Sequence, residues 1–121
     1  MSKNTNRGIQ AERLACDHLL AHGLSLIQRN YRCPYGEIDL IMEDRDSLIF
    51  VEVRYRTHDS FGSALESITT TKQHKIIATA QHYLQQMKII DKPCRFDAIG
   101  ITPKQETNSR IIWLVNAFQL N

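Results

Sequence analysis

Residues 37–43 read EIDLIME and residues 48–56 read LIFVEVRYR, and these two stretches decide the fold. Both are rich in the branched and aromatic side chains that favour β-strands, and the polar residues 44–47 between them are typical of a turn. The pattern therefore predicts a β-hairpin. Because apolar residues fill nearly every position rather than alternate ones, we expect both strands to be central and buried on two faces.

Further elements are predicted on both sides of the hairpin. Apolar periodicity indicates helices over residues 7–22 and 71–88. Strands are predicted over residues 24–32, at an edge of the sheet, and over residues 95–101 and 110–115. The order is α-β-β-β-α-β-β. Because a helix separates two strong strands, at least one strand pair should be parallel, so the sequence predicts an α/β fold with a mixed sheet of about five strands flanked by helices.

The two helices carry finer signals. The apolar stripe of the first helix should consist of Leu14, Ala15, Leu19 and Leu20. Thr70 and Gln73 have the spacing of a capping box at the start of the second helix, which would explain Gln73 by helix initiation alone. Residues 1–6 are polar, and we expect them to fray.

Composition limits the class of protein. The chain has 121 residues and 42% hydrophobic content, which fits one domain spanning residues 1–121. No stretch approaches the roughly 18–20 apolar residues that span a bilayer, and the polar N-terminus does not resemble a signal peptide. The three cysteines are widely spaced, which argues against a disulfide framework or a structural zinc site. We therefore expect a cytoplasmic protein. The net charge of +2 is too small to diagnose nucleic-acid binding.

Charged residues interrupt the two central strands. Asp39 lies among apolar residues of the first strand, and Glu52 and Arg54 interrupt the second. Burial of an unpaired carboxylate costs several kcal/mol, so these charges must be paired, bound to a cation or placed where water reaches. Side chains two apart share a face of a strand, and hairpin partners lie side by side, so Asp39 and Glu52 can be neighbours. Two adjacent carboxylates together with a substrate phosphate suit a magnesium ion.

Three segments carry a resemblance to a known family. Residues 36–41 (GEIDLI), residues 50–54 (FVEVR) and residues 95–97 (RFD) resemble, in order and spacing, the YraN-like family of uncharacterised bacterial proteins. The resemblance runs from the first helix to residues 116–118. That family is assigned to the restriction-endonuclease-like superfamily with the PD-(D/E)xK nuclease motif, which includes Holliday-junction resolvases. The resemblance therefore implies a restriction-endonuclease-like core and a metal-dependent nuclease acting on DNA, at branched or junction structures.

The resemblance also assigns roles to particular residues. Asp39 matches the first metal-binding acid, Glu52 matches the acid of the (D/E)xK element, and Glu12 matches an acid that often completes the site, with Mg²⁺ or Mn²⁺ as the cofactor. Arg54 stands where the family usually has lysine. Arginine stays protonated, so Arg54 cannot be a general base, although it can contact phosphate through two N–H groups. Lys72 or Gln73 matches a polar position near the scissile phosphate.

The remaining cations complete the predicted nucleic-acid contacts. Arg32, Arg56, Lys72 and Lys75 should bind flanking phosphates, which predicts an affinity that falls steeply with salt. Resolvases act on two-fold symmetric substrates, so the resemblance also implies a homodimer.

Other interpretations of these residues stay open. Asp39 and Glu52 could form structural ion pairs with nearby arginines, and Glu12 could be an exposed helix carboxylate. Asp97 is expected to pair structurally with Arg95 in its own strand. If the arginine at position 54 abolishes turnover, the same fold could serve as a catalytically silent DNA-binding protein or as a protein-interaction module.

Overall fold

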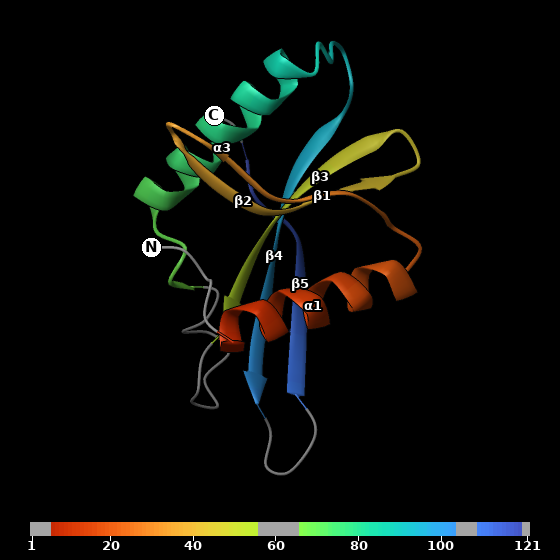
Figure 1. Cartoon of the computed structure of the whole chain (residues 1–121), viewed down its shortest axis with the longest axis vertical. Coiled ribbons are helices and arrows are strands. Elements are labelled where there is room, and N and C mark those ends of the chain that lie inside the picture. The colour runs from red at the N-terminus through yellow and green to blue at the C-terminus, as the bar shows by residue number, and fades with distance from the viewer. Residues whose placement is uncertain (1–5, 56–65, 104–108, 120–121) are drawn as a thin grey trace.

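Within the residues that the structure describes, five strands and two helices follow the predicted order (Figure 1). The computed structural model describes residues 6–55, 66–103 and 109–119. Its elements are α1 (Asn6–Ala21), β1 (Ser25–Cys33), β2 (Gly36–Asp44), β3 (Ser47–Tyr55), α3 (Thr70–Gln86), β4 (Cys94–Pro103) and β5 (Ser109–Phe118).

The five strands form one mixed sheet in the order β1-β2-β3-β4-β5. The pairs β1–β2, β2–β3 and β4–β5 are antiparallel, and the pair β3–β4, which α3 connects, is parallel. The predicted hairpin, the parallel pair, the edge position of the first strand and the α/β class are thus confirmed. None of the helices in the described residues has the length and apolarity needed to cross a bilayer.

The two helices pack on opposite faces of the sheet. Alternate residues of β3 belong to two separate apolar clusters: Ile49 and Val51 contribute to the cluster that contains α1, whereas Leu48 and Phe50 contribute to the cluster that contains α3. Because neighbouring strand residues point to opposite faces, β3 is buried on both sides. This is the physical reason for its nearly continuous apolar sequence.

The buried face of α1 differs from the predicted stripe. Ala15 and Leu19 are fully buried as expected, but Leu14 and Leu20 are exposed. Their places against the sheet are taken by small residues and by one carboxylate, so the buried residues are Gly8, Ala11, Glu12, Ala15, Cys16 and Leu19. Small residues at this spacing let the helix lie close to the strands. The interpretation of Glu12 as an exposed helix carboxylate is therefore wrong.

The start of α3 lies one residue earlier than the predicted capping box requires. Thr69 is the N-cap, and its hydroxyl accepts a hydrogen bond from the backbone N–H of Lys72 at 3.2 Å. The side-chain amide of Gln73 donates to the carbonyl of Ile68 at 3.2 Å. The capping box built on Thr70 is thus wrong in register, although Gln73 does satisfy a backbone group at this helix end.

Asp97 holds the last two strands together. The β4–β5 register shifts between Phe96 and Ala98, and Asp97 lies at that irregularity with no exposed surface. One carboxylate oxygen accepts from the backbone N–H of Asn116 at 2.9 Å, and the other accepts from the indole N–H of Trp113 at 2.9 Å. Arg95 also pairs with Asp97 at 3.0 Å. The predicted Arg95–Asp97 pairing is confirmed, and the carboxylate replaces main-chain partners that the bulge removes.

Candidate active site

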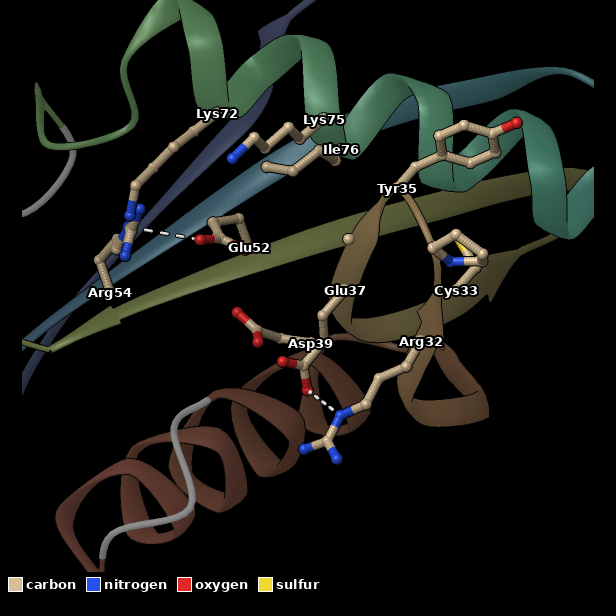
Figure 2. Close-up of a pocket in the computed structure, with 12 residues that line it drawn as sticks. Arg32, Cys33, Tyr35, Glu37, Asp39, Glu52, Arg54, Lys72, Lys75 and Ile76 are labelled. Carbon is tan, nitrogen blue, oxygen red and sulfur yellow. Dashed lines mark hydrogen bonds and ion pairs between the residues drawn. The ribbon is translucent and has the colours of Figure 1, made fainter. Parts of the chain in front are cut away.

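A cavity of about 540 Å³ opens where β2 and β3 stop pairing (Figure 2). It is bounded by the central strands, the β1–β2 turn and the first turns of α3. Its lining residues are Arg32, Cys33, Pro34, Tyr35, Gly36, Glu37, Asp39, Glu52, Arg54, Lys72, Lys75 and Ile76. Six of these residues were predicted from the sequence: Arg32, Asp39, Glu52, Arg54, Lys72 and Lys75.

Asp39 is placed by the end of the β2–β3 ladder. The last paired residues of that ladder on this side are Leu40 and Val51, so Asp39 and Glu52 come next on their strands. Instead of continuing the ladder, the backbone N–H of Val53 donates to Oδ2 of Asp39 at 2.8 Å. The carboxylate, which is only 3% exposed, thereby takes the place of a main-chain acceptor and is fixed beside Glu52.

Glu52 and Arg54 lie two residues apart on β3 and line the same cavity. Oε2 of Glu52 is 3.4 Å from Nε of Arg54, and both side chains are almost entirely buried. The Nε and Nη2 atoms of Arg54 are buried and make no hydrogen bond within the described part of the chain. Unsatisfied N–H groups on a buried cation are costly, and they are the donors that a phosphate group accepts from.

The first turns of α3 supply two lysines. Figure 2 shows Lys72 and Lys75 extending from α3 towards the side of the cavity where Glu52 and Arg54 lie. The helix stays close to the β1–β2 turn because Gly36 has no side chain: a Cβ atom there would lie 3.1 Å from Oγ1 of Thr79. This close approach brings cations of α3 opposite carboxylates of the sheet.

Arg32 and Glu37 form the rim of the cavity next to the β1–β2 turn. Nε of Arg32 lies 3.2 Å from Oε2 of Glu37 in a half-exposed ion pair. The sequence pointed to Arg32 and left open whether Glu37 supports the site or is an exposed strand end, but it missed Tyr35, which is 58% exposed beside the cavity. Turn residues give little periodic signal, so only the fold reveals that these side chains border the site.

Two predicted site residues, Glu12 and Gln73, are not among the lining residues of this cavity, and a third lies outside the described part of the chain. Glu12 lies on α1 and lines a neighbouring hollow of about 410 Å³ with Asn30 and Arg29. Gln73 turns back to Ile68, as described above. Arg56 lies outside the described residues.

The donor set of the cavity has a defined chemical preference. Asp39 and Glu52 are hard oxygen donors from adjacent strands, and Mg²⁺ typically binds through one or two carboxylates together with water and substrate phosphate. Within residues 6–55, 66–103 and 109–119, no group of three or more His, Cys, Asp or Glu side chains is arranged to hold a metal ion. The residues therefore fit an ion that is completed by phosphate oxygens better than a closed structural metal centre.

Comparison with known proteins gives a consistent family match. A model of the uncharacterised protein family UPF0102 matches residues 11–101. A UPF0102 protein of Nitrosococcus oceani is 56% identical over 116 residues, which is 95% of this chain and 93% of that protein. A UPF0102 protein of Saccharophagus degradans is 49% identical over 122 residues, covering 100% of this chain and 99% of that protein.

Among solved structures, the chain has a distant likeness to Pyrococcus furiosus SfsA in complex with Ca²⁺. The two are 15% identical, the match covers 84% of this chain and 58% of that chain, and the TM-score is 0.35. A likeness at this score does not establish a common fold.

Proposed function

The chain belongs to the uncharacterised protein family UPF0102, and from its own site we propose that it is a divalent-metal-dependent nuclease that hydrolyses phosphodiester bonds in DNA. This family is the one whose motifs residues 36–41 and 50–54 resemble. The finer assignment to the restriction-endonuclease-like PD-(D/E)xK superfamily is part of the proposal, as are Mg²⁺ or Mn²⁺ as cofactor and a branched or junction substrate.

One observation carries the proposal. The carboxylates of Asp39 and Glu52 meet in one cavity with the guanidinium of Arg54, whose buried Nε and Nη2 atoms make no hydrogen bond among the described residues. A site for a metal–phosphate complex needs carboxylates that bind the cation and free N–H donors that bind the phosphate. A purely structural ion-pair cluster would instead be expected to satisfy the buried donors of its arginine.

Each side chain has a distinct task in this proposal. Asp39 and Glu52 would hold the ion, and Asp39 is kept in place by the backbone of Val53. A bound divalent ion would supply Lewis-acid polarisation of the phosphoryl group and a water of lowered pKa. Lys72 and Lys75 would bind the phosphates that flank the scissile bond, together with Arg32 at the rim and Arg56 beyond the described residues.

Arg54 would act on the phosphate and not on the attacking water. A guanidinium remains protonated at any ordinary pH, so it cannot accept a proton. Its planar N–H groups match two phosphate oxygens, and in a buried setting they stabilise the charge that develops during in-line displacement. In this proposal, Arg54 orients the phosphate.

A second candidate function has one observation in its favour. The 3.4 Å contact between Glu52 and Arg54 neutralises one of the two acids, which would weaken ion binding. A protein that keeps the cationic cavity and has lost turnover would bind DNA without cutting it. Both candidate functions involve DNA binding, and they differ only in whether the site that includes Glu52 and Arg54 of β3 cleaves the DNA.

Cleavage assays on branched, flapped, single-stranded and duplex DNA with Mg²⁺ or Mn²⁺ test the proposal. We expect wild-type protein to cut at least one of these substrates, and Asp39→Ala and Glu52→Ala to abolish cutting. Glu43→Ala is a matched control, because Glu43 lies on β2 but pairs with Lys92 away from the cavity. It should cut as the wild type does.

Arg54→Lys separates the two candidates. It keeps the positive charge and restores the usual lysine, so activity should persist or rise if the enzyme is active. Cutting that appears only in Arg54→Lys would identify the silent DNA-binding protein. Absence of both cutting and salt-dependent DNA binding in every variant would refute both candidates.

A further inference from the structure

An exposed aromatic side chain borders the cavity at the β1–β2 turn. Tyr35 is 58% exposed, and among the residues that the structure describes it is the only phenylalanine, tryptophan or tyrosine that is exposed. It lies in the short turn that the paired residues Cys33 and Gly36 close. A single exposed apolar side chain is ordinary on a protein surface, so the surroundings of Tyr35 decide whether it has a function.

The ring of Tyr35 is supported from the side of α3. It packs edge-to-face against His82, with the ring centroids 6.1 Å apart and the planes at 66°. His82 shares a hydrogen bond through Nδ1 with the hydroxyl of Tyr31, and the Tyr31 ring packs edge-to-face against Tyr83 at 5.1 Å. Tyr31 and Tyr83 are both buried, so this series of contacts connects the exposed ring to the core. A ring that is held in place loses little conformational freedom when a flat ligand stacks on it.

The cavity combines an apolar part with cations. Its apolar lining residues are Cys33, Pro34, Tyr35 and Ile76. Figure 2 shows Tyr35 on the side of the cavity away from Arg54, with Lys75 extending from α3 between them. A nucleotide carries the two matching groups, because its base is flat and its phosphate is an anion. Aromatic side chains that stack on bases beside a cationic groove are typical of sites for single-stranded nucleic acid.

The pairing state of the DNA decides whether a base can reach Tyr35. Bases inside an intact duplex are stacked on both faces, so an unpaired or extruded nucleotide is needed to present a face to a side chain. We propose that Tyr35 stacks on the base of an unpaired nucleotide next to the phosphodiester bond that is cut. The inference rests on the proposed function, because it places that bond at Asp39 and Glu52. It makes unpaired nucleotides, as in a flap or a single strand, the feature that the site selects.

Titrations of two labelled DNAs test the inference. One is a flapped DNA with 2-aminopurine at the first unpaired nucleotide, and the other is a fully paired duplex of the same sequence. Anisotropy of an end label reports affinity, and quenching of 2-aminopurine fluorescence reports stacking. The titrations are run in EDTA, where no metal-dependent cutting occurs, and again with Ca²⁺, which also takes oxygen ligands.

We expect Tyr35→Leu, which removes the ring, to bind the flapped DNA about tenfold more weakly than the wild type and to lose the quenching. Its affinity for the duplex should not change. Tyr35→Phe keeps the ring and should behave as the wild type on both DNAs. Leu114→Ala is the control for removal of an exposed apolar side chain, because Leu114 is 44% exposed on β5 and does not line the cavity. It should also behave as the wild type.

Three results would overturn the inference and leave the proposed nuclease standing. The first is Tyr35→Leu protein that keeps its affinity for flapped DNA and the quenching. The second is an equal loss of affinity for flapped DNA and duplex, which would mean that Tyr35 does not distinguish unpaired nucleotides. The third is Tyr35→Phe protein that behaves as Tyr35→Leu does, because the hydroxyl rather than the ring would then make the contact. Wild-type protein that binds no DNA in either condition would overturn the inference together with the proposed function.

Discussion

Replacement of Asp97 by alanine should destabilise the fold by about 3–5 kcal/mol, the usual cost of removing one partner from a buried charged network. Asp97 is fully buried and accepts hydrogen bonds from Trp113 and from the backbone of Asn116. Each buried donor left without an acceptor costs about 1–3 kcal/mol. Arg95 adds less, because its side chain is 26% exposed and water can solvate it after the change.

Urea denaturation followed by tryptophan fluorescence would measure this loss, since Trp113 is the single tryptophan of the chain. Far-ultraviolet circular dichroism would test whether the transition is two-state. Glu43→Gln serves as the control, because Glu43 pairs with Lys92 at 2.6 Å where both side chains remain partly exposed, and it should lose little stability. A loss below about 1 kcal/mol for Asp97→Ala would refute the assignment of Asp97 as the acceptor that joins β4 to β5.

Three further predictions concern other parts of the fold. Burial lowers the pKa of His18 in the folded protein, so the unfolded chain binds a proton more readily. The contribution of neutral His18 to stability should therefore be fully present above about pH 6.5 and be lost as the pH falls towards the lower pKa of the folded state. The melting temperature of His18→Gln should fall less with decreasing pH than that of the wild type. Gly36→Ala should lose about 1–2 kcal/mol in urea denaturation because the new methyl group crowds Thr79, and unchanged stability would show that the turn can move away from α3. Cys94 is an exposed residue, but partial burial raises the pKa of its thiol. A thiol reagent should therefore label Cys94 slowly at pH 7 and faster above pH 9. The buried Cys16 should react only when the protein unfolds.

The strands could be predicted because their signals are local. Apolar runs bounded by turn residues located all five strands, and the α3 crossover implied the parallel pair. The last strand is the exception, since the prediction ended at residue 115 and β5 continues to Phe118. Asn116 adopts a positive φ there and is held by Asp97, so the strand persists through a side-chain contact that no local pattern reveals.

The buried face of α1 shows a limit of periodicity. Leu14 and Leu20 have the right spacing for a core stripe, yet both are exposed. Hydrophobicity favours the larger side chains, whereas close packing of this helix on the sheet selects small residues such as Ala11 and Cys16. That choice depends on the distance between layers, which the sequence of one helix does not contain.

The candidate site was predictable to the extent that it depends on strand register. Asp39 and Glu52 occupy corresponding positions on hairpin partners, so their proximity follows from the hairpin itself. The contacts of the Asn30 amide with Glu12 and Glu37 could not be predicted in this way, because they arise where a helix and an irregular strand meet. An asparagine within a strand is a weak signal of irregular backbone, and it becomes informative only once its φ angle is known.

The charge balance of the cavity explains why position 54 is the decisive test. Its described lining residues include four cations, Arg32, Arg54, Lys72 and Lys75, and three carboxylates, Glu37, Asp39 and Glu52. The lining is therefore only weakly positive, and a divalent ion held by the acids would make the cavity attractive to a polyanion. Arg54→Lys leaves this balance unchanged, so any difference in cleavage must come from the shape or the basicity of the side chain. Loss of DNA affinity in that variant would mean that the planar donors of Arg54 hold phosphate, whereas a gain in turnover at equal affinity would mean that arginine restrains the chemistry.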